Sequence, residues 1–296
     1  MIRHLSQWTN QRITSFNPWT NVYGLVRSIF AFSLFITLFF NDATLLFRPS
    51  SGNPTWVKTD TLSMFSFVPE TSFALNLIRI ICLILLLVVM SGWRPRVTSL
   101  FHLYIAYSIN SGATTIDGGE QVNLVMALLL LPIALTDNRK WHWQNISSIN
   151  RHYSKTIAYI AYVFIRIQVA ILYFHSFTAK LDNDEWLDGT AVYYYLLDPM
   201  LGLPNFLMNP LHFLLASPFI VVITWVTLFI QLLLVCALFM SKNNWSKVLW
   251  CAVLFHELIA VLLGLISFSI AMLAMLIIYL RPLEQVFVWQ KNKRRK

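Results

Sequence analysis

A lysine followed by acids and a tryptophan is the first group of residues in this sequence that could do chemistry. Lys180 closes an apolar stretch and is followed closely by Asp182 and Trp186, with further acids between and after them. A lysine removed from water loses its proton more easily and can then act as a base. The alternative is an ordinary ion-paired collar at a membrane boundary. Lys180 is therefore a candidate catalytic residue, and Asp182 and Trp186 are candidate cavity residues.

Two carboxylates around a glycine pair form the second group. Asp117 precedes Gly118 and Gly119, and Glu120 and Gln121 follow them. Paired carboxylates suit acid and base chemistry. The alternative is a tight turn in which the acids cap the next helix, because glycine permits positive φ and a carboxylate stabilises a helix N-terminus. Asp117 and Glu120 are candidate catalytic residues, and Gln121 is a candidate cavity residue.

Ionisable residues inside apolar spans form the third group. His256 is a candidate catalytic residue, because the adjacent Glu257 would suit proton transfer, although a helix-to-helix hydrogen bond is the simpler role. Ala260 stands where a zinc-binding H-E-x-x-H motif needs its second histidine, so no metal site is expected. Arg166 and Arg79 need buried partners. An ion pair between Arg166 and Glu257 would neutralise both, and all three charged residues are candidates for the cavity.

The elements that carry these residues are apolar helices. Of the 296 residues, 57% are hydrophobic and 12% are charged, whereas soluble domains are about 45–50% apolar and about 25% charged. We predict an all-α polytopic membrane protein, a bundle of about eight transmembrane helices with interfacial segments, forming a single domain over residues 1–296. The spans are expected near residues 22–41, 73–91, 97–116, 120–136, 157–178, 217–240, 247–264 and 267–281.

The segments outside the spans are expected to lie at the membrane surface. Residues 1–20 are interpreted as an interfacial N-terminal helix and residues 282–296 as a basic cytoplasmic tail. Two further segments, near 42–72 and 179–216, carry the proline, tryptophan and aromatic residues typical of interfacial chains. No separate soluble domain and no internal repeat is expected.

The charges predict the orientation. Most of the 22 lysine and arginine residues fall in the segments that share a side with the two termini, so the termini should be cytoplasmic in a multi-pass protein of the cell membrane. Arg27, early in the first span, is interpreted as reaching the cytoplasmic interface. The acids gather on the opposite side, which is therefore the expected working face. The basic residues form no patch interleaved with aromatics, so no nucleic-acid partner is expected.

Several motifs resemble the sporulation-delaying protein B (SdpB) family over nearly the whole chain. They are Asn17-Pro18-Trp19, Gly92-Trp93-Arg94-Pro95-Arg96, the stretch from Thr115 to Gln121, Glu185-Trp186 with Gly189-Thr190-Ala191, Asp198-Pro199 with Gly202-Leu203-Pro204, and the stretch from Val221 to Trp225. The resemblance implies a role in maturing a secreted cannibalism toxin, with a small SdpA-like partner and an SdpC-like precursor peptide. It also implies a place in the HTTM group of membrane proteins, whose best-known member is vitamin K-dependent gamma-carboxylase.

The likeness to the carboxylase is more distant and rests on Lys180-Leu181-Asp182, with Trp186 after it, and on Phe255-His256. It implies that Lys180 is a base, that His256 lies near the same pocket, and that a quinone is the candidate for a cofactor that is otherwise unknown. This chain departs from the carboxylase by an extra residue before Trp186 and by Gly119-Glu120-Gln121 where the carboxylase has an Asn-Asn-His motif. It has no room for the carboxylase's lumenal peptide-binding domain, so substrate capture should need a partner.

Three functions are compatible with these residues. The chain could be a peptide-maturation enzyme or enzyme subunit, or a noncatalytic membrane scaffold or chaperone for the precursor. It could also be a transporter or a quinone-dependent redox protein that uses its intramembrane charges as a proton path, although the inverted repeats typical of transporters are not found.

Overall fold

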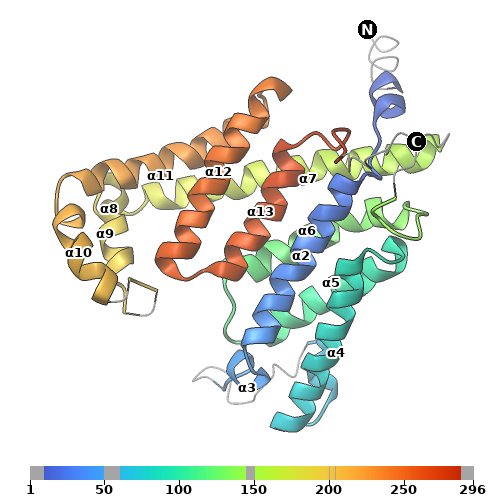
Figure 1. The fold of residues 1–296 in the computed structure, drawn as a ribbon, viewed down its shortest axis with the longest axis horizontal. Coiled ribbons are helices and arrows are strands. Elements are labelled where there is room, and N and C mark those ends of the chain that lie inside the picture. The colour runs from blue at the N-terminus through green and yellow to red at the C-terminus, as the bar shows by residue number, and fades with distance from the viewer. Residues whose placement is uncertain (1–9, 50–60, 145–150, 200, 204, 288–296) are drawn as a thin grey trace, which may run out of the picture.

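The protein is a bundle of long helices (Figure 1). The structure, a computed structural model, describes residues 10–49, 61–144, 151–199, 201–203 and 205–287. The long helices in this part of the chain are α2 (Asn21–Phe40), α4 (Ser72–Ser91), α5 (Pro95–Gly112), α6 (Gly118–Leu135), α7 (His152–Leu181), α11 (Phe219–Cys236), α12 (Lys242–Leu263) and α13 (Ile266–Leu280). Each corresponds to one of the eight predicted spans.

The lengths and compositions of these helices confirm an all-α polytopic membrane protein. Six of them, α2, α4, α6, α7, α11 and α12, are long and apolar enough to cross a bilayer. The helix α13 is apolar but has only 15 residues. The helix α5, which is among the least hydrophobic of the predicted spans, is not one of the six.

The core is built around α13 and α2. The helix α13 packs against α2, α12, α6 and α7, and α2 also packs against α4. Ala271 and Ala274 of α13 are fully buried, and small side chains let neighbouring helices approach closely. A second cluster of buried residues joins α2 to α4, α5 and α6, with Phe30 in the first cluster and Leu34 in the second. The helix α13, although short, thus lies at the centre of the bundle.

Short helices occupy the predicted interfacial segments. After α2 come α3 (Ala43–Leu46) and the 3-10 helix η1 (Met64–Phe67), and after α7 come α8 (Asp184–Leu187), α9 (Ala191–Leu197) and α10 (Asn205–Leu215). Phe206 and Phe213 of α10 are largely exposed, as expected for a helix in an interfacial layer. Of the predicted N-terminal helix, residues 10–15 are helical and residues 1–9 lie outside the described residues, as do residues 288–296 of the tail.

The buried His142 contacts helix α2 and the end of α4, and we call Arg27, Ser28, Gly92 and His142 the histidine clasp. Arg27 contacts His142 Nδ1 at 3.1 Å, and Ser28 Oγ lies 3.3 Å from His142 Nε2. The backbone N–H of His142 donates to the carbonyl of Gly92, which ends α4. Arg27 is only 1% exposed, so the prediction that it reaches the interface is wrong. It stays inside because the clasp and Thr98 supply acceptors there.

The clasp fixes the protonation of its imidazole. Burial, followed by the charges of Arg27 and Arg139, lowers the pKa of His142 to about 2, so the ring is neutral. Because a guanidinium only donates hydrogen bonds, Nδ1 must accept from Arg27. The proton therefore lies on Nε2 and is donated to Ser28, whose hydroxyl donates in turn to the carbonyl of Met90 at 2.7 Å.

A pair of glycine substitutions tests the clasp. Gly92 and Gly264 both end helices with positive φ, of 85° and 71°. A Cβ at Gly92 would lie 2.2 Å from the ring of His142, whereas a Cβ at Gly264 would meet nothing within 4 Å. We expect Gly264→Ala to cost about 1 kcal/mol of stability from backbone strain. We expect Gly92→Ala to cost about 3 kcal/mol, because overpacking adds to the strain. Thermal unfolding in detergent measures both, and equal losses would contradict the clasp.

Candidate functional site

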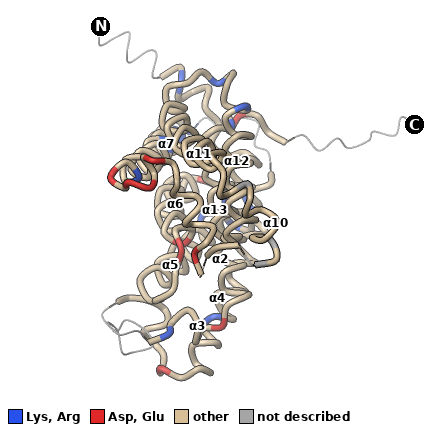
Figure 2. Tube along the Cα trace, turned by 90° about the vertical axis from the view of Figure 1, so that its left-hand side faces the viewer, with Lys and Arg blue, Asp and Glu red and all other residues tan. Residues whose placement is uncertain are grey.

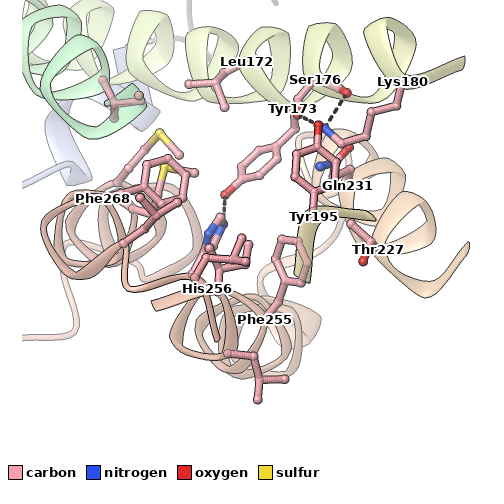
Figure 3. A pocket seen from close by; sticks show the side chains of 18 of the residues that line it. Leu172, Tyr173, Ser176, Lys180, Tyr195, Thr227, Gln231, Phe255, His256 and Phe268 are labelled. Carbon is pink, nitrogen blue, oxygen red and sulfur yellow. Dashed lines mark hydrogen bonds between the residues drawn. The ribbon is translucent and has the colours of Figure 1, made fainter. Parts of the chain in front are cut away.

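A cavity of about 670 Å³ lies between α6, α7, α11, α12 and α13, with α8 and α9 beside it (Figure 3). Its volume is within the range of small-molecule sites, about 300–1,000 Å³. Most of its wall is apolar or aromatic. The structure brings four of the predicted residues to this wall: Lys180, His256, Gln121 and Trp186.

Lys180 is held at one end of the cavity. Its Nζ donates to the carbonyl and the hydroxyl of Ser176, one turn earlier in α7, at 3.1 and 3.0 Å. The same nitrogen lies 5.1 Å from the centre of the Trp186 ring, a distance at which the ring face stabilises a cation. Within the described residues no salt bridge joins Lys180 to an acid, so the predicted ion-paired collar is not found. Lys180 therefore keeps a third N–H for another partner.

Local turns bring Trp186 over the lysine. Asn183 caps α8 by accepting from the backbone N–H of Glu185 at 3.2 Å, and α8 buries Trp186. Gly189 follows with a φ of 88° and lies against Val221 of α11, too close for a Cβ. Asp182, at the C-terminal end of α7, is exposed and does not line the wall. Figure 2 shows the acids of this segment gathered beside the end of α7.

A tyrosine and a histidine meet at the middle of the cavity. The hydroxyl of Tyr173 lies 2.9 Å from His256 Nε2 (Figure 3). The imidazole is 3% exposed and is packed edge-on against Phe255 and Phe268. Its second nitrogen, Nδ1, is buried and has no hydrogen-bond partner among the described residues. The histidine thus has a helix-to-helix hydrogen bond and one atom left for a further partner.

The two carboxylates of the glycine turn lie beside the cavity and face other helices. Asp117 and Glu120 form a capping box on α6, in which Glu120 Oε2 accepts from the backbone N–H of Asp117 at 2.9 Å. Glu120 Oε1 accepts from Thr37 of α2 at 2.7 Å, and the side chain is 3% exposed. Ser267 donates to Asp117 at 3.4 Å. This is the helix-capping turn that the sequence analysis gives as the alternative to a catalytic role. The catalytic role of both acids stays a prediction.

The remaining intramembrane charges are held away from the cavity. Arg166 stacks on Trp245 at 4.0 Å and reaches the carbonyls at the end of α11. Glu257 accepts from Ser269 at 3.2 Å. The predicted ion pair between Arg166 and Glu257 is wrong, because Arg166 finds an aromatic face and helix-end carbonyls instead. Arg79 caps α2 by donating to the carbonyl of Leu38 at 2.7 Å. None of the three lines the wall.

Sequence reasoning missed Gln231 and Gln168, which also line the cavity. Both lie on polar stripes that helical spacing makes visible. In α7, Gln168 is four residues before Leu172, which is four before Ser176, which is four before Lys180, and all four line the wall. In α11, Thr227 and Gln231 share a face, and both line the wall. Within the described residues no three histidine, cysteine or acidic side chains lie close enough to hold a metal ion.

The fold and cavity define a polytopic membrane protein with a mostly apolar cavity among its helices. The chain is 46% identical over 286 residues to uncharacterized protein YitO of Bacillus subtilis (strain 168), covering 96% of this chain and 92% of YitO. It is 40% identical over 274 residues to sporulation-delaying protein SdpB of the same strain, covering 92% of this chain and 85% of SdpB. The chain therefore belongs to the SdpB family.

The other comparisons add no relatives. No family model matches the chain. No solved structure matches it either. The wider resemblance to the HTTM group and to the gamma-carboxylase therefore stays a prediction.

Substitution of the capping acid tests whether it is structural. Asp117→Ala removes the side chain that accepts from the backbone N–H of Gly119 at 2.6 Å. We expect a loss of about 1 kcal/mol of stability and a parallel fall in the amount of protein in the membrane. Glu185→Ala, at an exposed acid of α8, is the control and should change neither. Unchanged thermal stability of Asp117→Ala in detergent, with loss of function, would point to chemistry instead.

Proposed function

We propose that this protein is the integral membrane component of a system that matures a secreted peptide toxin. It would act on an SdpC-like precursor with a small SdpA-like partner. Membership of the SdpB family supports a role in a toxin system, since one of the relatives is named sporulation-delaying protein SdpB. The observation that carries the proposal is the cavity in which Lys180, Trp186 and the Tyr173–His256 pair converge.

The convergent groups supply a mechanism for holding and activating a peptide. Lys180 has one N–H left for a further partner, so it can bind a carbonyl or carboxylate oxygen of the substrate, and after losing a proton it can accept one. His256 can exchange a proton with a bound group through Nδ1 while Tyr173 holds Nε2. Because the wall is mostly apolar, both interactions are stronger there than in water.

A cofactor can be accommodated in the same place. A quinone, which the wider resemblance implies, fits the aromatic wall and the hydrogen-bonding atoms of Tyr173 and His256. When bound, it would supply redox chemistry. Lys180 and His256 would then bind and orient the substrate and hold a proton.

The Lys180 end of the cavity is the proposed extracytoplasmic face and the docking side of the small partner. Exposed acids of the α7–α8 turn lie near this end. Lys242, at the start of α12, and Arg281, at the end of α13, lie at the other end of the bundle. This separation of charge follows the positive-inside rule. A secreted precursor would reach the cavity from this face.

A noncatalytic scaffold or chaperone is the second candidate, and the placement of the other charges favours it. Arg79 caps a helix, Arg166 stacks on Trp245, and Asp117 and Glu120 form a capping box, so each has a structural use. In a scaffold the same would hold for Lys180, and its loss would reduce the amount of protein together with processing.

Substitution of Lys180 separates the two candidates. We expect Lys180→Met to reduce mature toxin by more than tenfold when expressed with the precursor and partner, because the cavity loses its charged donor. The level of the protein in the membrane should stay unchanged. Lys247→Met, at an exposed lysine of α12, is the matched control and should process normally. Mass spectrometry of the secreted peptide and an immunoblot measure both quantities. Normal processing by Lys180→Met would remove the active-site role.

Cysteine labelling tests the proposed orientation. The native Cys82, Cys236 and Cys251 are free and can be replaced by alanine. A single cysteine is then placed at Asp184 or at Lys242, both exposed. A membrane-impermeant maleimide added to intact cells should label the first position and leave the second unlabelled until the cells are lysed. The reverse pattern would invert the orientation and exclude processing from outside.

A further inference from the structure

The cavity extends along α7. Along α7 its wall runs from Gln168 to Lys180, which is about 18 Å of helix at 1.5 Å per residue. An extended chain rises about 3.3 Å per residue, so this length corresponds to roughly five residues. The cavity therefore has the length of a short extended segment.

The wall selects an uncharged occupant. Over the described part of the chain, Lys180 is the one lysine, arginine, aspartate or glutamate that lines the cavity, and it lies at one end. A cationic side chain deeper inside would find no carboxylate. Apolar groups such as Leu172, Met126 and Phe268 surround the middle and would contact apolar side chains.

Two residues of this wall, His256 and Gln231, each carry a buried polar atom. His256 Nδ1 and Gln231 Oε1 have no hydrogen-bond partner among the described residues, and their side chains are 3% and 6% exposed. Figure 3 shows both side chains at the cavity. An unpaired buried polar group destabilises the protein that contains it. A bound molecule that pairs with both atoms would regain this free energy.

The chemistry of the two atoms favours amide groups over an acyl chain. Gln231 Oε1 accepts a hydrogen bond. His256 Nδ1 donates if Tyr173 donates to Nε2, and accepts if it does not, so a partner with both a donor and an acceptor serves either tautomer. A peptide backbone offers both at every residue. A lipid with its head group at Lys180 would place hydrocarbon against both atoms and leave them unpaired.

We infer that the cavity binds a short, uncharged, apolar peptide segment in extended form, with backbone amides paired to His256 Nδ1 and Gln231 Oε1. This names the substrate class of the proposed maturation site and rests on that proposal. Apolar side chains of the segment pack on the wall, and Lys180 meets the segment at one end.

Photo-cross-linking of the full-length protein in detergent tests the position of the peptide. Benzoylphenylalanine replaces Phe255, which lines the cavity, or the neighbouring Leu254, which is 63% exposed, as the matched control. The probe is a capped, fluorescent decapeptide of leucine, valine and alanine, and a second probe carries one central lysine. We expect an adduct at position 255 only, and at least tenfold less with the lysine probe. Equal labelling at 254, or displacement of the peptide by lower concentrations of a short-chain phosphatidylglycerol, would overturn the inference.

Gln231→Leu is a second test, in which thermal stability and affinity for the peptide should change in opposite directions. Without peptide, its thermal stability should rise, because an unpaired buried polar group is removed. Its affinity for the decapeptide should fall about tenfold, because one hydrogen bond to the backbone is lost. A merely structural glutamine would lower stability and leave affinity unchanged, and that result would overturn the inference.

These experiments distinguish failure of the binding inference from failure of the proposed function. Peptide adducts at position 255 with normal processing by Lys180→Met would remove the active-site role and leave the binding inference intact. Loss of processing in Lys180→Met without any peptide adduct would overturn the binding inference alone.

Discussion

Hydrogen bonding inside an apolar bundle is the constraint on which the rest of this structure depends. A polar side chain at bilayer depth finds no water, so the protein must supply its partner or the side chain destabilises the fold. The histidine clasp meets this requirement by a chain from Arg27 through His142 and Ser28 to a backbone carbonyl. Arg79 and Arg166 meet it at the ends of α2 and α11, where carbonyls lack partners within their own helix. The intramembrane charges thus mostly fix helix ends.

Two buried histidines of the bundle illustrate this constraint. His102 Nε2 is paired with Asn123 Oδ1, and Asn123 donates to the carbonyl of Phe30. His256 has the same degree of burial, and its Nε2 is paired with Tyr173, whereas its Nδ1 is a buried atom without a hydrogen-bond partner among the described residues. This unpaired atom, on a residue that lines the cavity, is what supports the inferred binding role of His256.

The sequence predicts the positions of the helices along the chain well. It predicts poorly which face of each helix points toward its neighbours. Hydropathy and length identify the eight long helices of the described residues, because a run of about 20 apolar residues crosses a bilayer as a helix. The pairing of Arg166 with Glu257 fails because hydropathy does not determine which face of α12 meets α7. His142 lies in the segment between α6 and α7, outside any periodic pattern, so its clasp could not be predicted. Gln231 could have been predicted from its spacing to Thr227, since a polar stripe in an apolar span predicts an inward face.

The same constraint explains why Asp117 and Glu120 have a structural role, whereas Lys180 remains available at the cavity. Asp117 and Glu120 begin α6, where unpaired backbone N–H groups attract carboxylates, and their oxygens are occupied by that end and by Thr37 and Ser267. Lys180 ends α7, where carbonyls attract a cation, but Ser176 takes only two of its three donors. A helix N-terminus can saturate a carboxylate within one turn, whereas a flexible lysine at a C-terminus retains a donor and the freedom to redirect it. The residue with capacity left over is therefore Lys180, and it borders the cavity where two further polar atoms also lack partners among the described residues.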